Sequence, residues 1–216
     1  MTESIYNSFI QTKNDSTIPI LTNGKTVESR YNPQNDALRT LESYSQGNFF
    51  IVIGIASGIL ISLLKEKFSF AKIICIEKSQ NDITFLNQLE LVDDLSKSQN
   101  IIFTDIENLQ TVIEQNYIPS FYGNLQIIEQ RGWILENHDA TKQIQQKIQN
   151  ALFTITKDFN QNINYKSDGI VVLDYSFDAK ALPYSITSDI IESNQSILKY
   201  SIIKSNTLIF NKFLNR

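Results

Sequence analysis

The sequence predicts an α/β protein with a Rossmann-like, doubly wound and mostly parallel sheet, helices on both faces and a short β-hairpin in front. A continuous apolar run, typical of a strand buried on both faces, occurs at residues 49–53, and mostly apolar runs at residues 72–76, 100–104 and 125–129 are predicted to be further strands. Segments of helical length separate these runs. Such alternation of strands and helices is the pattern of a parallel sheet joined by crossover connections.

The region before the first run predicts a hairpin and a helix. Asn23-Gly24 lies between two short apolar–polar runs, and a type I′ turn needs positive φ at both of its central residues. Asn32 can cap a helix, and Pro33 suits a first helical turn because the missing N–H costs nothing there. Further helices are expected at residues 58–67, 81–91, 106–115 and 139–159.

Three segments make up the expected domain organisation. Residues 1–17 are polar and are expected to form a flexible N-terminus, and residues 18–163 the Rossmann-like domain with its leading hairpin. Residues 164–216 are expected to hold an extra strand, at residues 169–177, and a tail. This strand either completes the sheet or begins a second domain.

Composition and charge exclude several classes of function. The chain has 216 residues, 42% hydrophobic residues and a net charge of −4, so no basic surface favours nucleic acid. One cysteine and one histidine exclude an internal disulfide and a His-rich metal site. The polar start shows no signal peptide, and the longest apolar run is too interrupted to span a membrane. We therefore expect a cytoplasmic protein with no metal.

The turn after the first predicted strand is the main candidate site. Gly54-Ile55-Ala56-Ser57-Gly58 stands where a dinucleotide-binding fold carries its glycine-rich turn. Glu77 closes the next strand, where an acid commonly binds ribose hydroxyls. Asp105 closes the third strand, where a base or sugar can be contacted. The candidate cofactor-binding residues are Gly54, Ala56, Ser57, Gly58, Glu77 and Asp105.

A purely structural role for this turn is the competing interpretation. Ala56 places a methyl group where such turns often have glycine, so that a phosphate would approach the backbone less closely. Other candidates have ordinary explanations: Cys75 lies within a buried strand, His138 near a helix start, and Trp133 at a packing position. No catalytic residue is assigned.

An ordered set of motifs resembles the N-terminal domain of the motility-associated factor family. The set begins with Ser29-Arg30-Tyr31-Asn32-Pro33, followed by Ala37, the strand 51–54 with Gly58, and the strand 73–77 ending in Ile-Glu. The segment 121–125, with Arg131 and Trp133, resembles a later part of that domain. The resemblance spans about residues 20–160. Members are bacterial glycosyltransferases that modify flagellin, and they are related to hydroxymethylpterin diphosphokinases.

The resemblance also implies a second, transferase domain, whose first strand leads into a Gly-Pro-Ser-Leu loop for the activated sugar nucleotide. Asp174-Tyr175-Ser176-Phe177 stands in its place, and Ser176 alone is retained. An aspartate there would repel a phosphorylated donor. The second domain is therefore expected to be truncated or degenerate.

Three functional hypotheses follow. The first is a protein auxiliary to flagellar or surface glycosylation that binds a nucleotide, a nucleotide sugar or a protein of that machinery. The second is an S-adenosylmethionine-dependent methyltransferase, in which the glycine turn, Glu77 and Asp105 would hold the cofactor. The third is an active glycosyltransferase that uses a sugar nucleotide.

Overall fold

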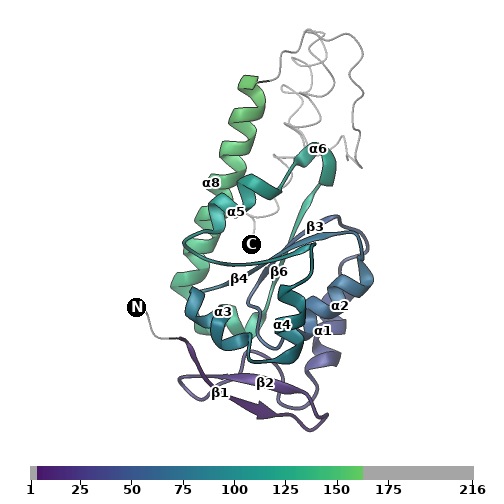
Figure 1. Cartoon of the computed structure of the whole chain (residues 1–216), viewed down its shortest axis with the longest axis vertical. Coiled ribbons are helices and arrows are strands. Elements are labelled where there is room, and N and C mark those ends of the chain that lie inside the picture. Colours follow the sequence, from purple (N-terminus) through teal and green to yellow (C-terminus); the bar gives the residue numbers. More distant parts are fainter. Residues whose placement is uncertain (1–3, 163–216) are drawn as a thin grey trace.

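The computed structural model describes residues 4–162 and has a four-stranded parallel sheet with a separate antiparallel hairpin (Figure 1). The spatial order of the parallel strands is β5-β4-β3-β6. Their bounds are Phe49–Ile53 for β3, Lys72–Glu77 for β4, Ile101–Asp105 for β5 and Leu125–Glu129 for β6. The predicted Rossmann-like α/β class is confirmed, and the strands at 49–53 and 125–129 have the predicted bounds.

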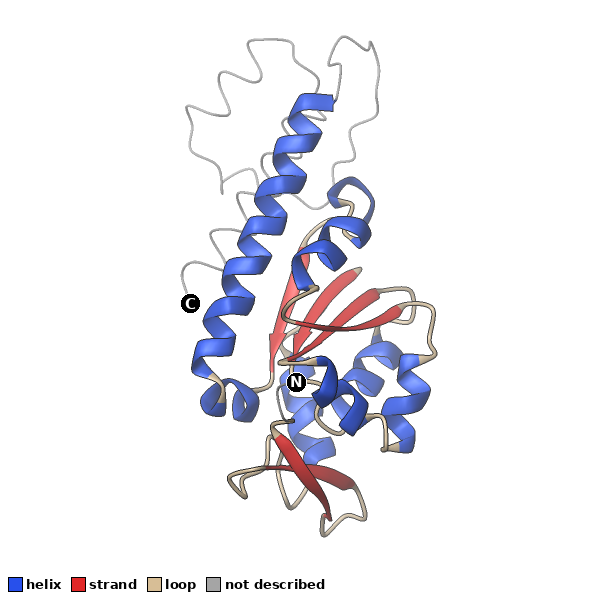
Figure 2. Ribbon diagram, turned by 60° about the vertical axis from the view of Figure 1, so that its left-hand side comes forward, coloured by secondary structure: helices blue, strands red, loops and turns tan. Residues whose placement is uncertain are grey.

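Helices cover both faces of the sheet (Figure 2). On one face α1 packs on α2 and α2 on α4, and on the other α5 packs on α8. The bounds are Pro33–Glu42 for α1, Ile59–Lys67 for α2, Glu90–Ser96 for α4, Leu109–Asn116 for α5 and His138–Asn162 for α8. Short helices at Gln80–Leu86 (α3), Pro119–Tyr122 (α6) and Arg131–Glu136 (α7) complete the described chain.

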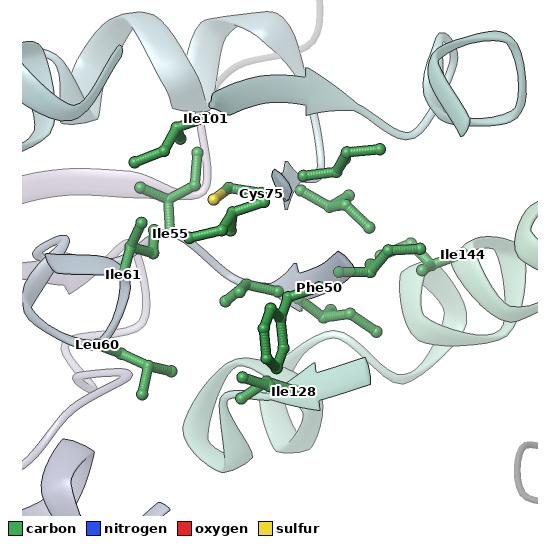
Figure 3. Packing of buried hydrophobic residues seen from close by; sticks show 14 of the residues in the cluster. Phe50, Ile55, Leu60, Ile61, Cys75, Ile101, Ile128 and Ile144 are labelled. Carbon is green, nitrogen blue, oxygen red and sulfur yellow. The ribbon is translucent and has the colours of Figure 1, made fainter. Parts of the chain in front are cut away.

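The core explains why β3 and most of β4 are apolar. All five residues of β3 are buried, as are the last five of β4, because helices cover the sheet on both sides. Figure 3 shows Phe50 and Cys75 of these strands among side chains from both helical layers, including Ile61 of α2 and Ile144 of α8. Burial raises the pKa of the Cys75 thiol well above its usual value, which favours the unreactive protonated form.

The helices differ from the prediction in one informative place. The single helix predicted at 81–91 is two helices, α3 and α4, because α3 ends with Asn87 as its C-cap. Leu86 and Val92 are both buried, but six residues of continuous helix would turn them to different sides. The break lets both helices pack on the core. The predicted start of α1 is confirmed, since the Asn32 side chain accepts a hydrogen bond from the Asn35 amide and Pro33 follows.

The segment expected to form a flexible N-terminus, residues 1–17, contains a strand. Tyr6–Gln11 forms β1, which pairs antiparallel with β2 at Thr17–Leu21. The predicted Asn23-Gly24 turn does form. The segments on its two sides pair only through an isolated bridge between Ile20 and Thr26, and the hairpin is formed by β1 and β2 instead. Strand β1 escaped detection because half of its six residues are polar and only Tyr6 is buried.

The hairpin is attached to the sheet domain by specific contacts. Asp82 of α3 is fully buried, and its carboxylate accepts hydrogen bonds from the Ile5 amide at 2.7 Å and from the Ser4 hydroxyl at 2.8 Å. The Tyr6 hydroxyl reaches Glu77 at the end of β4. Residues 4–6 thus bind groups that lie more than 70 residues further along the chain, so the hairpin belongs to the same folded unit.

A glycine in α7 permits a close approach between this helix and the backbone of the segment that precedes α1. A Cβ atom added to Gly132 would overlap the backbone carbonyl of Val27, which cannot turn away as a side chain can. We expect Gly132→Ala to lower the free energy of unfolding by about 2–3 kcal/mol in urea titrations, despite the better helix propensity of alanine. The control is Leu135→Ala on the same helix, where the side chain is 53% exposed. Equal stability of the two variants would contradict this packing.

The predicted strand at residues 169–177 and Ser176 lie outside the described residues. Within residues 4–162, no helix combines the length and the apolar character that crossing a bilayer requires.

Candidate functional site

The glycine turn joins β3 to α2 at the carboxyl edge of the sheet. Gly54, Ala56 and Gly58 all have positive φ, at 91°, 51° and 81°. For the non-glycine Ala56 this backbone costs about 1–2 kcal/mol. Gly54 is required on two counts, because its φ is left-handed and an added Cβ would lie 2.9 Å from the Trp133 ring. The surrounding packing therefore holds this turn in a strained shape.

The Glu77 side chain binds the glycine turn through hydrogen bonds. One carboxylate oxygen accepts hydrogen bonds from the Ile55 amide at 2.7 Å and from the Tyr6 hydroxyl at 3.0 Å. The other accepts the Trp133 indole N–H at 2.8 Å. Glu77 has no exposed surface. The acid predicted to bind ribose is therefore engaged by the protein's own donors.

The burial of Glu77 changes its protonation. Loss of solvent raises its pKa from 4.5 to about 7, although the Ile55, Trp133 and Tyr6 donors favour the carboxylate and oppose the rise. Burial also raises the Tyr6 pKa well above its usual value, with the Glu77 charge as the second cause. At neutral pH, Glu77 is thus close to its midpoint inside the core, and Tyr6 stays a neutral donor.

A second carboxylate, that of Glu28, binds the turn at Ser57. Glu28 accepts the Ser57 amide at 2.9 Å and the Ser57 hydroxyl at 2.8 Å, one on each oxygen. Burial raises the Glu28 pKa to about 7, against the lowering effect of these Ser57 bonds. Glu28 precedes the Ser29–Pro33 stretch. That stretch has a local structural role, since the Ser29 hydroxyl accepts the Tyr31 and Asn32 amides ahead of α1.

Every backbone N–H of the turn consequently has an acceptor. Those of Gly54 and Gly58 bond to carbonyls of Ile76 and Ile55. Those of residues 55 and 56 face Glu77, the second at a long 3.5 Å, and that of Ser57 bonds to Glu28. Phosphate-binding turns present such amides to the ligand. Here the amides of residues 55–57 donate to the protein's own carboxylates, and the other two donate to backbone carbonyls.

The crevice between β3 and β6, where parallel sheets of this order usually bind ligands, is filled. Trp133 is fully buried above Gly54, and the Gln130 side chain donates to the Gly54 carbonyl at 3.0 Å. Gly58 faces α4, where an added Cβ would lie 3.0 Å from Leu95. Five of the six predicted residues thus come together, in a packed structure.

Asp105, the sixth predicted residue, is the register partner of Glu77 across β4 and β5, and it lines a cavity of about 970 Å³ whose lining includes no residue of the glycine turn. The cavity opens at the carboxyl ends of β4 and β5, next to the start of α8. Lys78, Asp105, Glu107, Asn137 and His138 are among its lining residues. His138, which was predicted to have only an ordinary role near a helix start, therefore lines the same cavity as Asp105.

Sequence reasoning missed the partners that complete the turn. Tyr6, Glu28 and Gln130 carry no motif, and they lie 71, 29 and 76 residues from the groups they bind. Trp133 was assigned to packing, which is confirmed, but its hydrogen bond to Glu77 was not foreseen. Among residues 4–162, no group of three or more His, Cys, Asp or Glu side chains could hold a metal ion.

The fold and the turn together define a Rossmann-like protein with a closed glycine turn. Comparisons with protein-family models, curated proteins and solved structures found no match.

Proposed function

We propose that this chain is a cytoplasmic protein auxiliary to flagellar or surface glycosylation, which acts by binding a component of that machinery and performs no chemistry at its glycine turn. The family assignment rests on the resemblance of residues 20–160 to the N-terminal domain of motility-associated factors. The observation that carries the proposal is the occupied turn, in which the N–H groups of residues 54–58 all have acceptors within the protein.

This observation favours the auxiliary role over the two enzymatic alternatives. A methyltransferase or a sugar-nucleotide transferase that used this turn would have to displace the half-buried Glu28 or the fully buried Glu77 from its amides. Displacement of Glu77 would also leave the Trp133 indole without its acceptor. An unpaired buried polar group costs about 1–3 kcal/mol, which a ligand would have to offset for each bond broken.

A thermal-shift screen tests the closed turn. Purified protein is melted with S-adenosylmethionine, CMP, CMP-sugars, NAD and ATP, each in the millimolar range. A ligand at 100 times its Kd adds about 2.7 kcal/mol, which moves Tm by several degrees. We expect no shift above about 1 °C with any of them. A shift with the methyl donor would favour the methyltransferase, and one with CMP or its sugars the transferase.

Affinity purification tests the auxiliary role itself. The tagged chain is recovered from its source cells and the bound proteins are identified by mass spectrometry, with an unrelated Rossmann-like protein as the control bait. We expect enrichment of glycosylation or flagellar components on this chain alone. Equal recovery on both baits would count against the role, whatever the thermal screen shows.

A further inference from the structure

Strand β6 forms one edge of the parallel sheet. Among residues 4–162 it pairs with β3 alone, whereas β3 and β4 each pair on both sides. The Gln130 N–H donates to the Ile53 carbonyl, and alternate residues of a strand direct their backbone groups to opposite sides. The backbone groups of Leu125 and Ile127 therefore point away from β3. A sheet edge of this kind is a template for pairing with a further strand.

The side chains of β6 are less enclosed than those of its neighbour. All five residues of β3 are buried, but only two of the five in β6 are. Ile127 is half-buried, although its register partner Ile51 has no exposed surface. The Ile127 carbonyl accepts the Tyr44 hydroxyl at 2.8 Å. A carbonyl oxygen has two lone pairs, so this bond leaves one for the N–H of another strand.

The position of α8 determines on which side a following strand pairs. Strands β3, β4 and β5 succeed one another in one direction across the sheet, with α2 and α4 on one face. The chain then crosses from β5 to β6 in the opposite direction, through α5 on the opposite face, so all these crossovers have the same hand. In nearly all parallel sheets that hand is right. Because α8 packs beside α5, a crossover of the same hand through α8 leads to the outer side of β6.

The length of α8 returns the chain to the amino edge of the sheet, where its strands begin. The helix starts at the carboxyl edge, since His138 lines one cavity with Asp105 at the end of β5. Its 25 residues span about 37 Å and a five-residue strand about 17 Å, so α8 extends about 20 Å past the amino edge. Residues 163–168 cover the same distance when extended, at about 3.3–3.6 Å per residue. A strand that begins near residue 169 is therefore within reach of this edge.

We propose that residues 169–177 form a fifth parallel strand on the outer edge of β6. Residues 170–173, Ile-Val-Val-Leu, are a continuous apolar run, as expected of a strand that a helix covers. The proposal makes this segment part of the first sheet and not the start of a second domain. It places Asp174 at the carboxyl edge of the sheet, the edge at which the glycine turn lies. This inference does not rest on the proposed function.

Photo-cross-linking in the purified full-length protein tests this pairing. p-Benzoylphenylalanine replaces Ile127 on β6 in one variant and Ile102 on β5 in the other, because both isoleucines are half-buried on edge strands. After irradiation, we expect peptide mass spectrometry to find residues 169–177 joined to position 127, with at least tenfold less of this product at position 102. Absence of the product at position 127, or equal yields at both positions, would overturn the proposal. A covalent dimer through position 127 would also overturn it, since a second copy would then occupy the edge.

Hydrogen exchange followed by NMR tests the strand without any substitution. In the wild-type protein the amides of residues 170–173 should exchange at least tenfold more slowly than those of an unstructured peptide of the same sequence, because ladder hydrogen bonds protect them. The outward-facing Ile127 amide should be protected as well. Exchange of residues 170–173 at the unstructured rate would contradict the fifth strand.

Val172→Pro distinguishes a fifth strand from an independent second domain. Proline removes a donor from the middle of the proposed strand and disrupts its pairing. The Ile127 amide should then exchange at least tenfold faster than in the wild type, while the amides of β5, on the opposite edge, keep their rates. Protected residues 170–173 in the wild type, combined with an Ile127 amide that Val172→Pro does not affect, would place the segment in a domain of its own. If Val172→Pro does not fold, the cross-linking and the wild-type exchange decide the question.

Discussion

Replacing Trp133 by alanine is expected to lower the free energy of unfolding by about 3–5 kcal/mol, the usual cost of emptying a buried tryptophan site. The indole is fully buried and covers Gly54. Its N–H also donates to the buried Glu77 carboxylate. The variant therefore loses packing above the turn and a donor to an enclosed acid together. Urea unfolding followed by far-UV circular dichroism measures the loss without needing the tryptophan.

A second variant separates these two contributions. Trp133→Phe keeps most of the ring packing and removes the N–H, so it should cost about 1–3 kcal/mol, the value of a buried partner left unpaired. The control is Phe153→Ala on α8, where the aromatic ring is 65% exposed and its removal should change stability by less than about 1 kcal/mol. Should Trp133→Ala cost no more than this control, Trp133 does not hold the turn.

The stability of the folded protein is expected to decrease as pH rises from 5 to 8. The pKa of Glu77 is about 7 when folded and 4.5 as the ordinary value, so the folded state binds the proton more tightly. This stabilisation is complete below pH 4.5 and is lost as pH rises through about 7. At about 1.4 kcal/mol per pKa unit, Glu77 alone accounts for roughly 3 kcal/mol at most. Glu28 acts in the same direction.

Urea titrations at several pH values between 5 and 8 measure this slope. Glu77→Gln cannot ionise, so its stability should decrease less over the same range, even though the amide fits the Trp133 donor less well. Glu66→Gln is the control, because Glu66 is exposed on α2 and should keep the wild-type slope. A wild-type slope in Glu77→Gln would show that this carboxyl does not titrate in the window.

The single tryptophan provides an independent readout. Its indole N–H lies 2.8 Å from a Glu77 oxygen, so ionisation of Glu77 should change the fluorescence of the folded protein. We expect a transition centred near pH 7 in the wild type and none in Glu77→Gln. A transition that is the same in both proteins would assign the titration to another group.

Much of the sheet was predictable because its strands are buried on both faces. Residues 49–53 have no polar side chain, and a five-residue run of that kind has few other structures open to it. Strand β1 shows the opposite case. Only Tyr6 of its six residues is buried, and its pairing with β2 gives it a structure that its mixed polar and apolar composition does not predict.

The position of the candidate site could be predicted from the sequence, but the side chains that surround it could not. Gly54, Gly58 and Glu77 follow from local rules, since a sharp strand-to-helix turn needs positive φ and strand ends gather at one edge of a parallel sheet. The groups that bind this turn come from elsewhere in the chain. Glu28 arrives from the segment before α1, Tyr6 from β1 and Trp133 from α7.

The amino-acid sequence was sufficient for the order of the elements, the parallel sheet and the place of the glycine turn, because these depend on short-range periodicity and backbone preference. Tertiary structure alone decided what occupies the turn. The hydrogen bonds that Glu28 and Glu77 accept from its amides depend on contacts between residues 21 to 29 positions apart, and Trp133, which covers the turn, is further still from it along the chain. No local pattern encodes such contacts, because they form only when the separate segments pack into one core.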